Sequence, residues 1–109
     1  MKTVFVVVAL FLSACAHQRP VRDEAHRLVN AGALLVDVRT PQEFAASHLP
    51  GAVNIPVDAL QERLGELGSP EQPVVVYCGS GARSSRAERL LKARGFQQVV
   101  NLGPMSAWE

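Results

Sequence analysis

Hydrophobic residues in this chain occur either in short runs or at helical spacing, and the two patterns alternate along the sequence. The runs at 33–38 and 73–77 are mainly aliphatic, which is typical of strands covered on both faces of a parallel sheet. A further strand is predicted at 98–102, and a brief one at 52–55 between a Pro-Gly turn and Pro56. The pattern thus predicts four strands.

Two longer segments have helical periodicity and their own terminal signals. The first lies between Pro20 and Gly32, residue types that favour the start and the end of a helix. The second is predicted over 84–94, with basic residues in its last turns and Gly95 as its stop. The residues expected to face the core are Val21, Ala25, Leu28 and Val29 in the first helix and Ala87, Leu90 and Leu91 in the second.

Two shorter helices are predicted from their capping residues. Thr40 as N-cap, Pro41 at the first helical position and Glu43 three residues after the cap form a capping box. A later segment has Asp58 as its cap and Gln61 at the box position. One face of this last helix is expected to carry Leu60, Leu64 and Leu67.

The alternation of strands and helices predicts the fold class. It is typical of an α/β fold with a mainly parallel central sheet and helices on both faces. A chain of 109 residues closes only one core, so a single small domain is expected.

The first residues have a different composition from the rest. One Lys precedes an unbroken apolar run from Val4 to Leu12, and small residues follow. This run is too short for a permanent membrane span and is typical of a secretory signal, which is excluded from the fold. Without residues 1–14, which contain one Lys, ten basic residues face ten acidic ones. A neutral domain with no polybasic run gives no reason to expect nucleic acid as a partner.

Cys78 is the residue with the clearest chemical potential. It stands at the end of a predicted strand, where open α/β sheets bind ligands, and it opens the loop CGSGAR. Gly79 and Gly81 allow successive backbone N–H groups to point inward and form a nest for an anion. These donors, the positive end of the 84–94 helix and Arg83 are expected to lower the pKa of the thiol.

Three separated motifs resemble the rhodanese family and cover nearly all of the chain after the signal. They are LLVDVRTPQEFAASHLPGAVNIPVDAL, VVVYCGSGARSSRAERLLKARGF and VVNLGPMSAW. A single domain behind an export signal is similar to the phage-shock-type rhodaneses of the bacterial envelope. The resemblance implies a thiosulfate sulfurtransferase without a cofactor, which takes sulfane sulfur from a small anionic donor and passes it to cyanide or a thiol. The sulfur would be carried as a persulfide on Cys78. The residues implied to bind the persulfide or the donor are Gly79, Ser80, Gly81, Ala82 and Arg83.

Loop length separates this interpretation from related phosphatases and arsenate reductases. Those enzymes need a C-x5-R loop, which is wide enough for a tetrahedral oxyanion. Here Cys78 and Arg83 enclose four residues, and the tighter ring suits a sulfur atom. The sequence also departs from the family at two positions. Gly79 stands where many rhodaneses have a larger residue, and Pro104 replaces the second glycine of a usual GG pair.

The segment LSAC is similar to the lipobox of bacterial lipoproteins. That resemblance implies a signal peptide at 1–14, lipidation of Cys15, a short tether over 15–19 and a domain over 20–109. The resemblance to Gram-negative lipoproteins also implies the periplasmic side of the outer membrane over the inner membrane, because Ala16 and not an Asp follows the cysteine. The alternative is an ordinary signal peptide with an incidental cysteine. If Cys15 is lipidated, Cys78 is the only free thiol and an intrachain disulfide is impossible. The protein is expected to be a monomer.

Other polar residues and the terminal tryptophan are assigned structural roles. Asp37 is expected to hold its loop or Arg39 through a salt bridge, and both are supporting residues of the site. His48 is interpreted as a hydrogen-bonded turn residue and His26 as a helix surface position, while Trp108 should pack on the core and could line the rim of the site. No Cys/His spacing indicates a metal site.

Several functions are compatible with the sequence. The first is an enzyme, a lipid-anchored sulfurtransferase, with a persulfide carrier for an unknown protein acceptor as its nearest variant. The second is a binding module in which Cys78 reacts slowly, and the third is a thiol redox sensor. Cys78 could also be an inert buried residue, and Arg83 a structural ion-pair partner.

Overall fold

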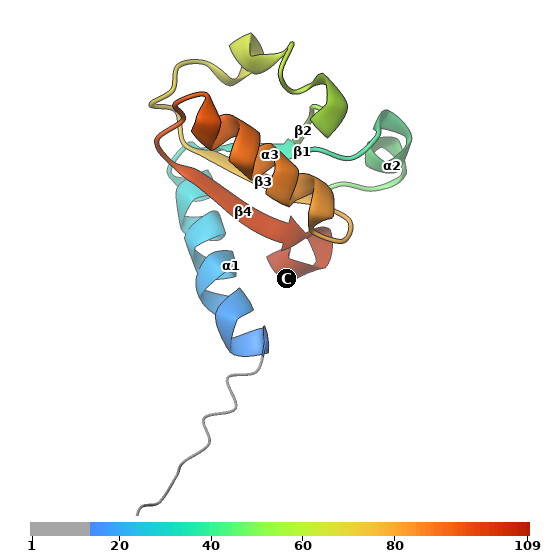
Figure 1. The fold of residues 1–109 in the computed structure, drawn as a ribbon. Helices are drawn as coiled ribbons and strands as arrows, with labels where there is room; N and C mark the ends of the chain where they lie inside the picture. The colour runs from blue at the N-terminus through green and yellow to red at the C-terminus, as the bar shows by residue number, and fades with distance from the viewer. Residues whose placement is uncertain (1–13) are drawn as a thin grey trace, which may run out of the picture.

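The computed structural model describes the backbone of residues 14–109 and the side chains from Pro20 onward. Residues 1–13 of the signal peptide predicted at 1–14 and the side chain of Cys15 lie outside this description. The helices and strands are α1 (Ala14–Asn30), β1 (Leu34–Asp37), α2 (Pro41–Ala46), β2 (Val53–Asn54), β3 (Val74–Cys78), α3 (Ala82–Ala93) and β4 (Val99–Pro104), as Figure 1 shows. Short 3-10 segments are η1 (Val57–Ala59), η2 (Leu64–Leu67) and η3 (Met105–Trp108).

The strands form one parallel sheet in the order β2-β1-β3-β4. All five residues of β3 are buried, because this strand lies between β1 and β4 and is covered on both faces. The α/β class, the parallel sheet and the central place of the 73–77 run are therefore confirmed.

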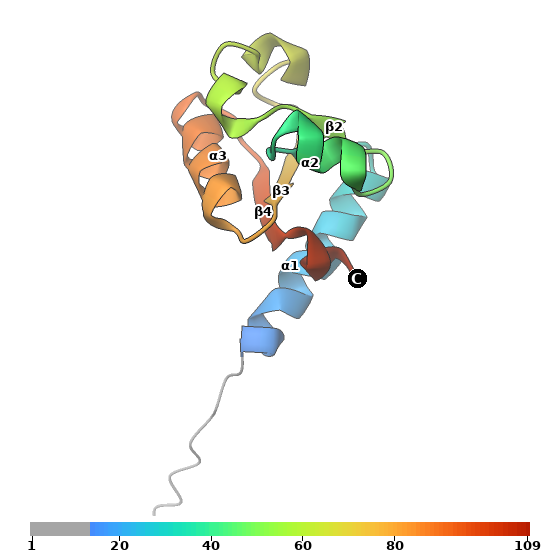
Figure 2. The ribbon, with the colours of Figure 1, turned by 90° about the vertical axis from the view of Figure 1, so that its right-hand side faces the viewer.

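A hydrophobic layer lies on each side of the sheet, and Figure 2 shows α3 and α1 on opposite sides of it. Alternate residues of β3 enter different layers, since side chains in a strand point to opposite faces. The layer under α3 is formed by Val36, Val38, Ile55, Val57, Leu60, Leu67, Val74, Val76, Cys78, Ala87, Leu91 and Phe96. The layer under α1 is formed by Ala25, Leu28, Leu35, Leu49, Val75, Tyr77 and Leu102.

The capping box predicted for α2 is present. The Thr40 side chain accepts a hydrogen bond from the Glu43 backbone, and the Glu43 carboxylate accepts one from the Thr40 backbone N–H. Pro41 stands in the first turn, where its missing N–H leaves no helical bond unmade. This cap fixes the direction in which the chain leaves β1.

The prediction of a continuous helix after Asp58 is wrong, because the chain forms η1 and η2 joined by turns. The Val57 backbone N–H donates to the Val38 carbonyl at 3.0 Å, which ties the chain to the end of β1. Asp58 does not cap a helix, since its carboxylate pairs with Arg86 at 2.9 Å. The predicted burial nevertheless holds for Leu60 and Leu67, which are 0% and 1% exposed.

Two helices begin earlier than the sequence predicts. The first begins at Ala14 and contains Pro20 in its interior, so residues 15–19, expected to form a tether, have helical backbone. The third begins at Ala82 and not at residue 84, which shortens the loop after β3. None of the helices within residues 14–109 is both long and apolar enough to cross a membrane.

Candidate active site

Cys78 is the last residue of β3 and lies opposite Pro104 at the carboxyl end of the sheet. Its side chain is 0% exposed and belongs to the hydrophobic layer under α3. The strand therefore delivers the thiol directly below the first turn of α3, at the edge where parallel sheets bind ligands.

The loop after Cys78 is made by Gly79, Ser80 and Gly81, because α3 begins at the next residue. Gly81 is the N-cap of α3 and has a φ of 103°, a left-handed conformation that favours glycine. Its backbone N–H donates to Cys78 Sγ with an N···S distance of 2.9 Å. Within the loop, one of the N–H groups predicted to face inward, that of Gly81, donates to the sulfur, and Gly81 is also the N-cap of α3.

Ser84 is a further partner of the sulfur that the sequence analysis missed. Its Oγ lies 3.4 Å from Cys78 Sγ, and its side chain is completely buried. The Ser84 hydroxyl donates to the Gly81 carbonyl at 3.1 Å and its oxygen accepts from the Cys78 thiol, so it turns from this carbonyl when it donates to a thiolate. Ser84 could have been identified from its place in the first turn of α3, close to the end of β3. That place is known only once the start of α3 is set at Ala82.

The pKa of Cys78 is below its ordinary value. Burial acts to raise this pKa, but hydrogen bonds from the Ser84 side chain and from the backbone N–H groups of Ser84, Gly81 and Arg83 lower it by more. Free N–H groups of a helix N-terminus favour a negative charge. The direction agrees with the expectation from the sequence, although Ser84 replaces part of the predicted donor set.

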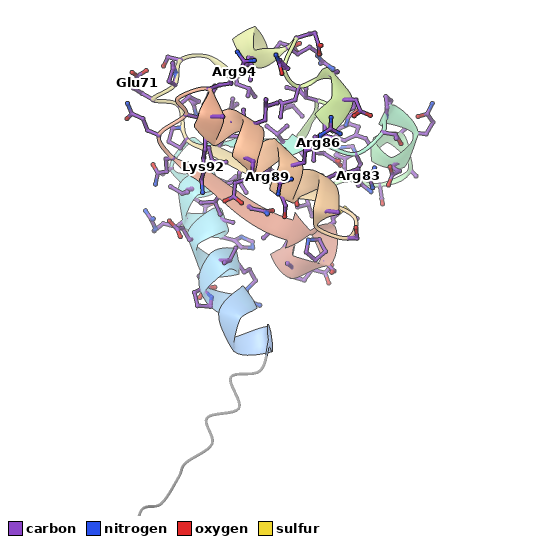
Figure 3. The ribbon with its side chains drawn as sticks, in the orientation of Figure 1. Glu71, Arg83, Arg86, Arg89, Lys92 and Arg94 are labelled. Carbon is purple, nitrogen blue, oxygen red and sulfur yellow. The ribbon has the colours of Figure 1, made fainter. Side chains whose placement is uncertain are left out.

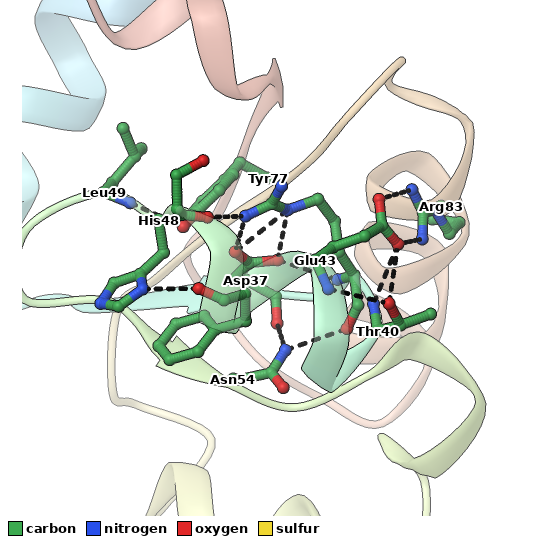
Figure 4. A network of polar contacts seen from close by, with 11 residues as sticks. Asp37, Thr40, Glu43, His48, Leu49, Asn54, Tyr77 and Arg83 are labelled. Carbon is green, nitrogen blue, oxygen red and sulfur yellow. Dashed lines mark hydrogen bonds and ion pairs between the residues drawn. The ribbon is translucent and has the colours of Figure 1, made fainter.

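Arg83 is engaged with a carboxylate. Its guanidinium donates to both oxygens of Glu43, at 2.6 and 3.0 Å, which Figure 4 shows as a two-pronged pair between α3 and α2. The guanidinium also lies against the loop, since a Cβ placed on Gly79 would be 3.5 Å from Arg83 Nη2. Arg83 therefore lies beside the cysteine loop and has the structural ion pair weighed as its alternative, while its contact with a donor stays a prediction.

Glu43 is the second site residue that the sequence analysis missed. Its carboxylate accepts hydrogen bonds from Arg83, from the Thr40 backbone N–H and from the Thr40 hydroxyl. These contacts, that with Arg83 above all, lower the pKa of Glu43 to about 2. Its place in the capping box is visible in the sequence, but its partner is 40 positions away.

Asp37 and Arg39 form a buried pair below the site. The Arg39 backbone N–H and guanidinium donate to the Asp37 carboxylate, with the shortest distance at 2.6 Å, and the guanidinium also donates to the Ser47 carbonyl at 2.7 Å. The hydrogen bond with Asp37 is the main cause that raises the pKa of Arg39. The predicted salt bridge is present, and its contacts hold the ends of β1 and α2 together.

Tyr77 and Asn54 extend this polar network toward the neighbouring loops, as Figure 4 shows. The Tyr77 hydroxyl accepts the Leu49 backbone N–H at 3.1 Å, and burial is the main cause that raises the pKa of Tyr77 to about 12. The Asn54 side chain donates to the carbonyls of Asp37 and Arg39, both at 2.9 Å.

The two histidines have local partners. His48 Nδ1 lies 2.8 Å from the Phe44 carbonyl and its ring stacks on Phe44, in agreement with the predicted turn role. His26 is not a simple surface residue, because its ring stacks on Trp108 with centroids 3.6 Å apart and its Nε2 lies 2.6 Å from the Trp108 carbonyl.

Trp108 packs partly buried against the layer under α1, as predicted. It also lines a hollow of about 470 Å³ whose walls are His48, Leu49, Pro50, Met105, Ser106, Trp108 and Glu109. No residue from Cys78 to Arg83 lines this hollow, so Trp108 belongs to a neighbouring surface and does not contact the cysteine loop there.

Comparisons with known proteins agree with this geometry. The chain is 42% identical over 76 residues to a sulfurtransferase of Allochromatium vinosum, a match covering 69% of this chain and 70% of that protein. It is 35% identical over 69 residues to the thiosulfate sulfurtransferase PspE of Escherichia coli, covering 62% and 66% of the two chains. The solved structure of a rhodanese with anions from E. coli superposes with a TM-score of 0.66 at 31% identity, covering 70% of this chain and 91% of that one. Residues 21–109 match the rhodanese-like domain, and the chain therefore belongs to the rhodanese-like family.

Proposed function

We propose that this protein is a sulfurtransferase that moves sulfane sulfur from a donor such as thiosulfate to a thiol or cyanide through a persulfide on Cys78. One observation carries the proposal. The Sγ of Cys78 lies under the first turn of α3, where the Gly81 N–H at 2.9 Å and the Ser84 hydroxyl at 3.4 Å can stabilise a negative charge. The same donors suit a thiolate and a persulfide anion.

In the first half-reaction, the Cys78 thiolate attacks the outer sulfur of thiosulfate. A new S–S bond forms, the S–S bond of the donor breaks, and sulfite leaves with the electron pair. The cysteine then carries a persulfide anion, and the charge of the protein is unchanged. The N–H groups at the start of α3 point to Cys78 Sγ, and we expect them to stabilise also the outer sulfur that is bonded to it.

In the second half-reaction, a nucleophile attacks the outer sulfur of the persulfide. Cyanide leaves as thiocyanate, or a thiolate leaves as a persulfide, and the Cys78 thiolate is regenerated. The two substrates never occupy the site together, so ping-pong kinetics are expected. The names of the relatives from A. vinosum and E. coli support transfer chemistry, and thiosulfate as donor is taken from the second of them.

We also propose that the protein acts in the bacterial envelope and is anchored there through lipid on Cys15. The support is the apolar run followed by LSAC in the sequence. Several acyl chains on one residue would give stable anchoring, whereas a single chain is only marginal. Mass analysis of the protein from membranes tests this directly, since processing would remove residues 1–14 and add the mass of the lipid to Cys15.

The transfer chemistry is tested by intact mass spectrometry of the chain carrying Cys15→Ala, purified in detergent so that Cys78 is the remaining thiol. Thiosulfate should add the mass of one sulfur atom, and cyanide should then remove it. The matched control, Cys78→Ser in the same background, should gain nothing. If Cys78 is alkylated readily but never gains sulfur, the protein is a binding module; if it gains glutathione from oxidised glutathione instead, it is a redox sensor.

A further inference from the structure

The arginines near the cysteine loop are each paired with a carboxylate. Arg83 pairs with Glu43, the buried Arg39 with Asp37, and the exposed Arg86, one helical turn after Arg83, with Asp58. Figure 3 shows Arg83 and Arg86 along the same helix, α3. The guanidinium closest to the loop therefore has its charge balanced before any donor arrives.

The Glu43 carboxylate occupies one of the bidentate positions of the Arg83 guanidinium. Both terminal nitrogens of the guanidinium point to Glu43, at 2.6 and 3.0 Å. A dianion such as thiosulfate either displaces the carboxylate or binds the remaining N–H groups of Arg83 beside it, where the Glu43 charge repels it. The side chains of Arg83 and Glu43 are 36% and 38% exposed, so the pair stands at the surface over the loop and not inside the core.

Glu43 is held in this position by its own helix. The Thr40 backbone N–H and hydroxyl donate to Glu43 Oε1 at 3.2 and 3.1 Å, and this oxygen is also the one closest to Arg83. The contacts with Thr40 thus hold the carboxylate at the N-terminus of α2 independently of Arg83. A fixed negative charge beside the loop follows from the capping box.

We propose that Glu43 is a specificity-determining residue that disfavours doubly charged sulfur donors. The inference rests on the proposed function and narrows its donor class to organic sulfane sulfur compounds that carry one negative charge or none, such as alkyl persulfides and thiosulfonate anions. Thiosulfate still reacts, but the second negative charge lowers its rate relative to these donors. Because Glu43 acts through its charge, it changes how readily the donor binds near the loop and not the attack of Cys78 on the outer sulfur.

The reaction with an alkyl persulfide balances in the same way as that with thiosulfate. The Cys78 thiolate attacks the outer sulfur of R–S–SH, the new S–S bond forms on Cys78 and the thiolate R–S⁻ leaves. The proton of the transferred sulfur then passes to the leaving thiolate. The products are the Cys78 persulfide anion and a free thiol, so no oxidant or reductant is required.

The test compares two donors that differ in charge but transfer the same atom. These are thiosulfate, a dianion, and the methanethiosulfonate anion CH3SO2S⁻, which leaves as methanesulfinate. The second-order rate constant for sulfur addition to Cys78 is measured with each donor by quenched-flow mass spectrometry, and the result is expressed as the thiosulfate to methanethiosulfonate ratio. Changes in the reactivity of Cys78 itself cancel in this ratio.

Two variants should move the ratio in opposite directions. Glu43→Gln removes the charge but keeps the residue type that a capping box accepts, and it should raise the ratio about fivefold, the effect of one unit charge at close range in water. Arg83→Gln leaves the Glu43 carboxylate without its positively charged partner and should lower the ratio by a similar factor, about fivefold. The matched control is Asp58→Asn, which changes the net charge equally and frees Arg86 on the same helix. This control should change the ratio by less than about twofold, because the pair is highly exposed.

The outcomes separate this inference from the proposed function. If the unaltered chain gains sulfur from neither donor, the proposed function fails. If it gains sulfur but Glu43→Gln leaves the ratio unchanged, sulfur transfer stands and the role of Glu43 is refuted. An equal shift in Glu43→Gln and Asp58→Asn also overturns the role, since it would show an effect of net charge alone. Should Glu43→Gln fail to fold, Glu43→Ser, which also removes the negative charge, decides by the same rise in the ratio.

Discussion

The backbone N–H of Gly81 donates to Cys78 Sγ at 2.9 Å from a residue whose φ is 103°. A positive φ of this size is strained for any residue with a Cβ, whereas glycine adopts it readily. The conformation that lets the chain turn from β3 into α3 is thus the same one that points a donor at the sulfur. Gly81 therefore affects both the stability of the domain and the reactivity of Cys78.

Gly81→Ala is expected to slow persulfide formation and to destabilise the domain by about 1–2 kcal/mol. Space is not the cause, because an added Cβ would be 4.0 Å from the nearest atom, on Pro104. The strain would rotate the N–H away from the sulfur. Sulfur uptake by intact mass and thermal unfolding by circular dichroism measure the two effects.

Gly79→Ala is the matched control for this variant. Its Cβ would be 3.5 Å from Arg83 Nη2, an ordinary contact, and Gly79 is not among the glycines with positive φ. The control should keep both stability and sulfur uptake close to those of the unaltered chain. Equal losses in the two variants would show that the left-handed conformation of Gly81 is not what holds the loop.

Asp37→Ala is expected to lower the free energy of unfolding by about 3 kcal/mol or more. The carboxylate is 0% exposed and holds the Arg39 guanidinium, which is itself buried, so its removal leaves a buried charge without its partner. Chemical unfolding followed by circular dichroism gives the value. An exposed pair on α3 supplies the control, since Glu88→Gln, which breaks the contact with Lys92, should cost less than about 0.5 kcal/mol.

Acid should weaken the Glu43–Arg83 pair in a defined range of pH. The hydrogen bonds to Glu43, that from Arg83 first, lower its pKa from 4.5 to about 2 in the folded chain. A carboxylate with a depressed pKa stabilises the fold fully above its unfolded value and loses this effect as the pH falls toward the folded value. The Tm difference between the unaltered chain and Glu43→Gln should therefore be largest above pH 4.5 and shrink toward pH 2. A difference that stays constant over this range would contradict an electrostatic origin.

The elements that the sequence predicts well are those fixed by local patterns. The apolar runs give the strands because buried parallel strands need apolar residues on both faces, and the Thr40–Glu43 capping box gives α2 because its contacts are three residues apart. The same local reasoning places Cys78 at the end of β3, since a glycine loop follows the run directly. These features need no information about the rest of the chain.

The errors arise where distant residues decide the outcome. Asp58 would cap a helix in isolation, but it pairs with Arg86 and the chain beside it is bound to Val38. His26 has the pattern of a surface position, yet its partner Trp108 lies 82 residues away. The periodicity of a single segment does not predict such contacts, because they depend on how the helices pack against the two faces of the sheet.

Ser84 and Glu43 were missed for a related reason. Each has a plain local role, as a residue of the α3 first turn or as the partner of an N-cap, and that role is sufficient to explain its type. Their contacts with Cys78 and Arg83 depend on the exact start of α3 and on the packing of α2 against it. The sequence therefore predicts the position of Cys78 well and the side chains around it poorly.

Ser84→Ala should raise the pKa of Cys78 and so reduce its reactivity near neutral pH. Burial raises this pKa, but the Ser84 hydroxyl, which can turn from the Gly81 carbonyl to the sulfur, is the first of the contacts that lower it below the ordinary value of 9.0. Because the thiolate is the reactive form, the rate of alkylation by iodoacetamide rises with pH around the folded pKa. The midpoint should lie below 9.0 in the unaltered chain and move to higher pH in Ser84→Ala, with a loss of about fivefold in rate at neutral pH from one hydrogen bond.

Ser85→Ala is the matched control for Ser84→Ala, because the Ser85 hydroxyl also donates to the Gly81 carbonyl, at 2.8 Å, and has Asn101 and not Cys78 as its other partner. Its pH profile should coincide with that of the unaltered chain. The complete burial of Cys78 slows alkylation in all three proteins alike, so it changes the maximal rate and leaves the midpoint in place. If Ser84→Ala and Ser85→Ala shift the midpoint equally, the effect comes from the position of the Gly81 carbonyl. A shift in Ser84→Ala alone would assign the lowered pKa to a direct hydrogen bond from its hydroxyl to the sulfur.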